Sequence, residues 1–210
     1  AIVATSLGIA YDYKNDGKAA INAHLEAVEA ARKAGNVYLY LINRLWVTIA
    51  LKYAGRLPEA MSLCRQLLSE ISDKTLTFNV AVGHVWGTWG ELLYELNELD
   101  EAHRYTKKGV GLLEQGHDVG HLGHRYTCLV KILCSREDLA GAEDIVTKMD
   151  ELLQTSVIPP WVLNVIKAAK ARVLMMKGNI DVLVKWVKDC GLKLDDECTW
   201  KHDAEQIMFA

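Results

Sequence analysis

Three histidines in the middle of the chain have a spacing that could bind a metal ion. His117, His121 and His124 follow the pattern H-x-x-x-H-x-x-H, and two histidines four residues apart on a helix can share a metal. A structural zinc site normally shows four clear ligands, and we expect the one acidic neighbour, Asp118, to face another way. The pattern favours polar histidines near the start of a helix, and we predict no metal site.

The five cysteines offer no nucleophile that the sequence pairs with a base. They are Cys64, Cys128, Cys134, Cys190 and Cys198. A catalytic cysteine needs a positioned base, and buried small apolar residues are the ordinary interpretation. An odd, scattered set fits a reducing cytosol better than a disulfide framework. We therefore predict a cytoplasmic protein that is not an enzyme.

Two carboxylates lie one helical turn apart. Glu91 and Glu95 are four residues apart and would face the same side of a helix, with Tyr94 beside them. Carboxylates and tyrosines in a groove suit a polar organic ligand or a peptide. The alternative is a set of ion pairs on a solvated face, which contribute little to stability.

The composition of the chain limits the functions in which these side chains could take part. The chain has 210 residues, 24 Lys and Arg against 27 Asp and Glu, and a net charge of −3. This near-neutral balance argues against nucleic-acid binding by this chain. No apolar run reaches the roughly 20 residues needed to cross a bilayer, and no signal peptide is visible. Only three prolines occur, Pro58, Pro159 and Pro160, so long helices can run almost uninterrupted.

Five short turn segments recur at a nearly constant interval. They are NDGKAA, GRLPEA, NELDEA, EDLAGA and GNIDVL, and they end at residues 20, 60, 102, 142 and 183. The spacings are therefore 40, 42, 40 and 41 residues. Such a period indicates stacked helix hairpins, with repeats at about 1–36, 37–76, 77–117, 118–157 and 158–195 and a terminal helix at 196–210.

Each turn segment carries signals for a helix end followed by a helix start. Glycine can adopt the left-handed conformation that ends a helix, and asparagine tolerates it; these residues are Gly55, Gly178, Asn15 and Asn97. Aspartates favour the start of the next helix, where proline is also accepted; these residues are Asp16, Asp100, Asp181 and Pro58. Small residues follow where two helices would cross closely, at Ala60, Ala102 and Ala142, whereas Leu183 predicts looser packing of the last hairpin.

The apolar periodicity predicts eleven helices and no strands. Their expected ranges are 1–14, 18–34, 37–54, 58–72, 77–96, 100–115, 119–136, 140–154, 160–177, 181–190 and 196–210. We expect an all-α, right-handed superhelical solenoid of about five antiparallel hairpins, forming a single domain over residues 1–210. Trp86 and Trp89 should pack inside the third hairpin, whereas Trp46 and Trp161 could form either a stacking platform or core.

The first repeat resembles the tetratricopeptide repeat (TPR). It has small and large residues at the matching positions, namely Ala4, Leu7, Gly8, Tyr11, Ala20, His24 and Ala27. The third repeat matches with Trp86, Trp89, Gly90, Leu93 and Ala102. The TPR period is about 34 residues, so the longer period here adds roughly one turn to each helix.

The longer repeat resembles the MalT-like family, which comprises large ATP-dependent LuxR-type bacterial transcription activators. The resemblance lies in WGELLYELNELDEA at 89–102, with RLPEA at 56–60 and KARVLMMKGN at 170–179. It implies a sensor region that binds a small inducer or a regulatory protein, with possible self-association. ATP and DNA would be bound by other parts of a longer protein, because this chain has no phosphate-binding loop, no helix-turn-helix and no cofactor of its own.

The resemblance also implies which residues face the concave groove of the solenoid, because the first helix of each hairpin lines it. The chemically active members of that set are Lys52, Tyr53, His84, Glu91, Tyr94, Glu95, His124, Lys131 and Arg172. We predict that they bind the inducer or partner. The alternative is a general peptide-binding scaffold with no role in transcription.

Overall fold

The computed structural model describes residues 1–14, 16–73 and 79–189, and every regular element in these ranges is an α-helix. The ten helices are α1 (Ile2–Tyr13), α2 (Gly17–Lys33), α3 (Val37–Tyr53), α4 (Leu57–Asp73), α5 (Asn79–Glu95), α6 (Leu99–Gly116), α7 (Val119–Ser135), α8 (Leu139–Thr155), α9 (Pro160–Met176) and α10 (Ile180–Asp189). Each predicted boundary is correct to within two residues. The eleventh predicted helix lies outside the described residues, within which no helix is long and apolar enough to span a membrane.

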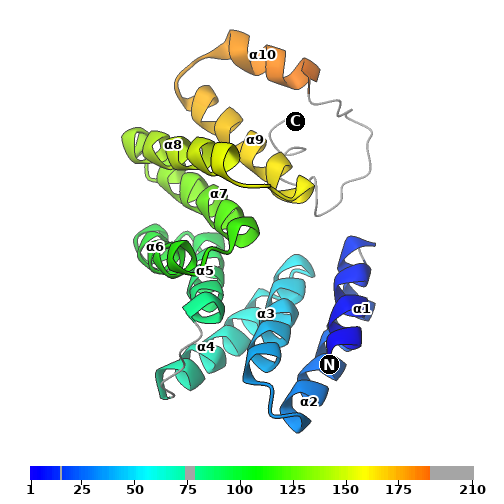
Figure 1. The fold of residues 1–210 in the computed structure, drawn as a ribbon. Coiled ribbons are helices and arrows are strands. Elements are labelled where there is room, and N and C mark those ends of the chain that lie inside the picture. Colours follow the sequence, from blue (N-terminus) through cyan, green and yellow to red (C-terminus); the bar gives the residue numbers. More distant parts are fainter. Residues whose placement is uncertain (15, 74–78, 190–210) are drawn as a thin grey trace. The chain divides into compact units, whose positions relative to one another are not determined.

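The chain divides into two compact units. The N-terminal unit comprises residues 1–116 and the C-terminal unit begins at His117. The first holds the hairpins α1–α2, α3–α4 and α5–α6, and the second holds α7–α8 and α9–α10 (Figure 1). The predicted all-helical hairpin architecture is therefore confirmed, whereas the single domain and the handedness of the superhelix stay predictions.

Within each unit the hairpins stack in chain order. In the N-terminal unit α3 packs against α1, α2, α4 and α5. In the C-terminal unit α7 packs against α8 and α9. The first helices of successive hairpins are therefore neighbours, which brings their side chains onto one surface in each unit.

Four of the turns inside hairpins, those that the structure describes completely, have the same backbone conformation. Gly55, Asn97, Glu137 and Gly178 have φ values of 72°, 60°, 60° and 71°. In each turn the next residue's N–H donates to the carbonyl five residues earlier, as Arg56 does to Leu51 at 2.9 Å. This pattern is the Schellman helix ending. The left-handed turn predicted at the two glycines and Asn97 is confirmed, and Asn15 lies outside the described residues.

The second helices begin as their sequences predict. The Asp16 carboxylate accepts a hydrogen bond from the Ala19 N–H at 3.0 Å and thereby caps α2. Asp100 and Asp181 lie in the first turns of α6 and α10, where a negative charge complements the helix dipole. Pro58 lies in the first turn of α4, where no intrahelical N–H is lost.

Small residues bring the two helices of a hairpin together. The equivalent residues Ala20, Ala60, Ala102 and Ala142 are all 0 % exposed. In the third hairpin glycines tighten the crossing, because a Cβ at Gly109 would lie 2.6 Å from the Gly83 oxygen and 2.7 Å from the Gly87 nitrogen. Leu183, at the equivalent position of the last hairpin, is partly exposed.

Candidate functional site

An ion pair joins two predicted groove residues of the N-terminal unit. The Lys52 ammonium on α3 donates to Glu91 Oε2 on α5 at 3.3 Å, with side chains 14 % and 10 % exposed. The pair lies between neighbouring first helices, so it links the second hairpin to the third. The sequence left open ligand binding or ion pairing on a solvated face; the structure shows an ion pair that is mostly buried, and ligand binding by these residues stays a prediction.

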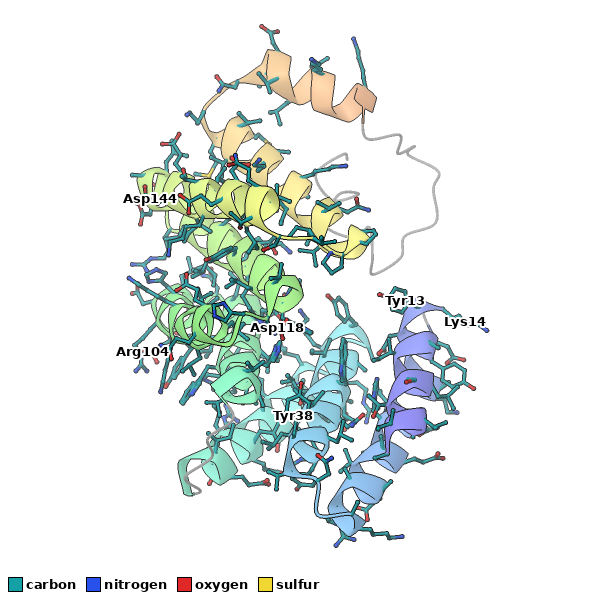
Figure 2. All side chains as sticks on the ribbon, in the orientation of Figure 1. Tyr13, Lys14, Tyr38, Arg104, Asp118 and Asp144 are labelled. Atoms are coloured by element: carbon teal, nitrogen blue, oxygen red, sulfur yellow. The ribbon has the colours of Figure 1, made fainter. Side chains whose placement is uncertain are left out.

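The remaining groove residues on α3 and α5 differ in accessibility. The Tyr53 ring lies under the Lys52 ammonium, 4.7 Å from its centroid, and is 47 % exposed. Tyr13, at the same position of α1, is 39 % exposed (Figure 2). Glu95 is exposed and Tyr94 partly exposed, whereas Glu91 is buried. Although Glu91 and Glu95 are one turn apart, only Glu95 is open to solvent.

His84 is the most deeply buried member of the predicted set. It lies on α5 and is 2 % exposed. A side chain with that little surface contributes to packing in this conformation, so the accessible groove chemistry of α5 comes from Tyr94 and Glu95.

Three predicted groove residues belong to the C-terminal unit. His124 and Lys131 lie on α7 and Arg172 lies on α9, and all three are partly exposed. Arg172 acts electrostatically on Cys134 of α7. Burial raises the pKa of the Cys134 thiol, and the positive charge of Arg172 opposes that rise only in part. The thiol is therefore a poor nucleophile at neutral pH.

The structure corrects one expectation about the histidine segment, the orientation of Asp118. Asp118 does not face away, because its carboxylate caps α7 and lies 3.0 Å from His121 Nδ1. His117 precedes α7 in a left-handed conformation with φ 54°, so it lies outside the helix, in agreement with the predicted range 119–136. The backbone N–H groups in the first turn of a helix have no partner within the helix, so they attract the Asp118 carboxylate. The prediction from the histidine spacing did not take this capping interaction into account.

One histidine lies near a cysteine that the sequence left without a base. Cys128 Sγ is 4.0 Å from His124 Nδ1, one turn earlier on α7. Cys64, Cys128 and Cys134 are all buried, as the sequence predicted for its thiols. This contact is a long sulfur hydrogen bond between two residues of the same helix.

Sequence reasoning missed a buried polar cluster around His24. This residue of α2 is 0 % exposed, and its ring nitrogens lie 3.0 Å from Asp12 Oδ2 of α1 and 3.3 Å from Asn43 Oδ1 of α3. The ring also stacks on Trp46 at 5.8 Å. His24 therefore joins two hairpins, and Trp46 fills the space between them. The available signal was a polar residue at a position where the TPR pattern has an aromatic one.

A second buried group lies between α3 and α4. The Arg44 guanidinium donates to the Tyr40 hydroxyl at 2.8 Å and to Gln66 Oε1 at 3.2 Å, and it pairs with Glu70. Arg44 is 8 % exposed. In the third hairpin the same positions hold Trp86 and Lys108, whose ammonium lies 3.6 Å from the ring centroid. Trp86 also stacks on Tyr105 of α6, as predicted for packing within that hairpin.

The first-helix surface of the N-terminal unit carries both aromatic and charged side chains. Its exposed members are Tyr13, Tyr53 and Glu95, and it also carries the partly buried Lys52–Glu91 pair. Tyrosines stack and donate hydrogen bonds, and a free carboxylate accepts them or pairs with a cation. This surface therefore suits recognition of a polar molecule or a peptide.

Several solved structures are similar in fold to this chain. The TPR-like repeats of a Podosopora anserina kinesin light chain are 14 % identical, with 89 % of this chain and 90 % of that chain covered and a TM-score of 0.62. The apo form of RapI (13 %, 88 % and 50 % covered, TM-score 0.68) and BtubC from P. vanneervenii (13 %, 93 % and 83 % covered, TM-score 0.68) are also similar. No curated protein matched the sequence.

The fold and the hairpin geometry define a TPR-like helical repeat protein. The pattern of the family described as the MalT-like TPR region matches residues 1–210. The chain therefore belongs to this family, and the resemblance found in the sequence is confirmed.

Proposed function

We propose that this chain is the effector-sensing and protein-interaction region of a MalT-like, LuxR-type transcription regulator. The observation that carries the proposal is the match of the MalT-like TPR region over the whole chain. The ligand would be a small inducer or a regulatory protein bound on the first-helix surfaces. Binding would favour one arrangement of the hairpins and transmit the signal as a population shift.

Two surfaces are available for this task. In the N-terminal unit the accessible residues are Tyr53, Tyr94 and Glu95, beside the Lys52–Glu91 pair. In the C-terminal unit they are His124, Lys131 and Arg172. Each set combines hydrogen-bonding groups with charge, which fixes the orientation of a polar ligand.

A thermal-shift screen of sugars, small organic acids and peptides against the purified chain tests the proposal. Glu95→Ala and Tyr53→Ala should weaken binding of a hit at least about tenfold, which is the loss of one charged or aromatic contact. Because both side chains are exposed, the melting temperature should stay within about 2 °C.

Glu91→Ala is the informative contrast. It breaks the partly buried pair with Lys52, so it should lower stability as well as binding. Loss of stability in Glu91→Ala with unchanged binding in Glu95→Ala and Tyr53→Ala would contradict a ligand role for this surface.

The regulatory part of the proposal has its own test. The gene that encodes this chain should also encode a phosphate-binding loop on one side and a helix-turn-helix on the other, where ATP and DNA would bind. A gene that encodes neither would leave the second candidate function, a general peptide-binding scaffold. That alternative rests on the fold, which resembles the TPR-like repeats of kinesin light chain.

A further inference from the structure

One face of α1 is an uncovered helical stripe. Val3 and Leu7 are 82 % and 44 % exposed, and Ser6 and Ala10 are also exposed. These residues follow the i, i+3, i+4, i+7 spacing of a single helix face. Val3 and Leu7 give the stripe its apolar character, and α1 lies at one end of the stacked hairpins of its unit (Figure 1).

The same stripe is buried in the equivalent helices of later hairpins. On α3 it comprises Asn43, Trp46, Val47 and Ala50, and on α5 it comprises Val85, Thr88, Trp89 and Leu92. All of these are at most 9 % exposed except Trp46, which is partly exposed. Burial is therefore the ordinary condition of this face in the repeat.

The second helix of the preceding hairpin covers the stripe in both cases. From α2, His24 reaches Asn43 and stacks on Trp46 of α3. From α4, the Cys64 thiol donates to the Val85 carbonyl of α5 at 3.9 Å, and the Arg65 guanidinium lies 5.3 Å from the Trp89 ring centroid. In both cases the residue four positions after the alanine at the helix crossing lies opposite the first residue of the stripe. These pairs are His24 with Asn43 and Cys64 with Val85.

We propose that the stripe of Val3, Ser6, Leu7 and Ala10 is a stacking surface for a further hairpin of the same repeat array. The second helix of that hairpin lies against α1 as α2 lies against α3. The surface continues an interface already made twice in this unit, with the same spacing and the same helix face. The proposal is independent of any ligand bound on the first-helix surfaces.

The side chains on α1 also define the chemistry of the added helix. Where α3 has the polar Asn43 opposite His24, α1 has Val3. A histidine opposite Val3 would lose that acceptor, whereas a thiol or an aliphatic group would pack on it. The occupant therefore resembles α4, with Cys64, rather than α2.

An extended form of the full chain tests this surface. A second copy of residues 37–73, which holds α3 and α4, is placed ahead of Ala1, so that α4 is the covering helix. A copy of residues 34–40 joins it to Ala1 and reproduces the spacing between α2 and α3. We expect the unfolding midpoint to rise by about 4 °C or more. Amide hydrogen exchange within α1 should slow at least about tenfold, since covered helices open less often.

Substitutions in the extended chain identify the contact. Val3→Asp should abolish both gains, whereas Ile2→Asp, at an apolar neighbour outside the stripe that is 71 % exposed, should leave them. Cys64→His in the added hairpin should reduce the gains. Unchanged exchange in α1, or gains that survive Val3→Asp, would overturn the proposal.

The unextended chain gives a second readout. Val3→Asp should leave its midpoint within about 1 °C, because the residue is solvated there; a larger loss would mean that the stripe is already covered. Light scattering should find the same mass for the unextended chain and its Val3→Asp variant. A dimer that Val3→Asp dissociates would assign the face to a second copy and overturn the proposal.

Discussion

The first and third hairpins place a glycine and a polar residue at the same two positions but close their helix crossings differently. In α1–α2 the His24 ring lies over Gly8, where a Cβ would be 2.6 Å from Nδ1. In α5–α6 a Cβ on Gly90 would overlap Thr106 Oγ1 and lie 2.8 Å from the Thr106 nitrogen. The first crossing is limited by a side chain and the third by backbone.

This difference shows that one repeat register tolerates two packing solutions. His24 keeps the first crossing open and uses its ring to hydrogen-bond to Asp12 and Asn43. The third crossing has no such ring, and Gly83, Gly87 and Gly109 let the two backbones approach. The first hairpin stabilises its crossing with buried polar contacts. The third hairpin closes its crossing by using glycines in place of larger side chains.

The largest effect is expected at the backbone-limited crossing. Gly109→Ala should destabilise the chain by about 3 kcal/mol, because its Cβ would meet backbone atoms of α5 that cannot move aside. Gly111→Ala on the same helix is the matched control, since nothing lies within 4 Å of its Cβ. It should stabilise by about 0.5 to 1 kcal/mol through helix propensity. Urea unfolding gives the free energy of unfolding of both variants. Equal changes in the two variants would contradict a crossing limited by backbone contacts.

The next effect separates a hydrogen-bonded residue from an unsatisfied one. His24→Leu should cost about 2 kcal/mol, because Asn43 Oδ1 stays buried without this donor. Thr106→Val should change stability by less than about 0.5 kcal/mol, because Thr106 Oγ1 is buried with no hydrogen-bond partner. Thermal unfolding of the two variants gives the comparison, and a costly Thr106→Val would contradict it.

A double-mutant cycle sharpens the same point. Gly8→Ala should cost about 2 kcal/mol alone and almost nothing in a His24→Ala background, since only the ring obstructs the new methyl group. Gly90→Ala should stay costly in a Thr106→Ala background, since the Thr106 nitrogen and the Ala102 oxygen also obstruct it. The coupling free energy from urea unfolding should therefore be large for the first pair and small for the second.

The smallest effects concern the turns, which the hairpins share. Asn97→Gly should stabilise by somewhat less than about 1 kcal/mol, and Gly55→Ala should destabilise by about 1 kcal/mol, because both positions have positive φ. If Asn97→Gly and Gly55→Ala change the unfolding midpoint by similar amounts in opposite directions, the turns are equivalent. The difference between the hairpins then lies in their helix crossings. A strong effect at only one turn would extend the difference to the turns.

The helix boundaries could be predicted because capping and turn residues act locally. Gly55, Asn97 and Asp16 each have a conformational preference or a hydrogen bond within a few residues. Glu137 is the exception, since glutamate has no preference for positive φ and only the repeat register places it in a turn.

The contacts between hairpins could not be predicted in the same way. Lys52 and Glu91 are 39 residues apart, and their pairing depends on how two hairpins stack. The partners of His24 on α1 and α3 depend on the same stacking. The family resemblance placed Lys52 and Glu91 on one surface, but only the packed helices decide that Glu91 is paired and Glu95 is open.

The shared Schellman turn has a consequence for the order of folding. Each hairpin closes on itself through two helices adjacent in sequence, and such local pairing should make hairpin formation fast. Stability then adds up along the array from hairpin and neighbour terms, as in a one-dimensional lattice. Within the N-terminal unit, fraying should begin at α1, whose stripe lacks a covering neighbour, and should spread inward one hairpin at a time.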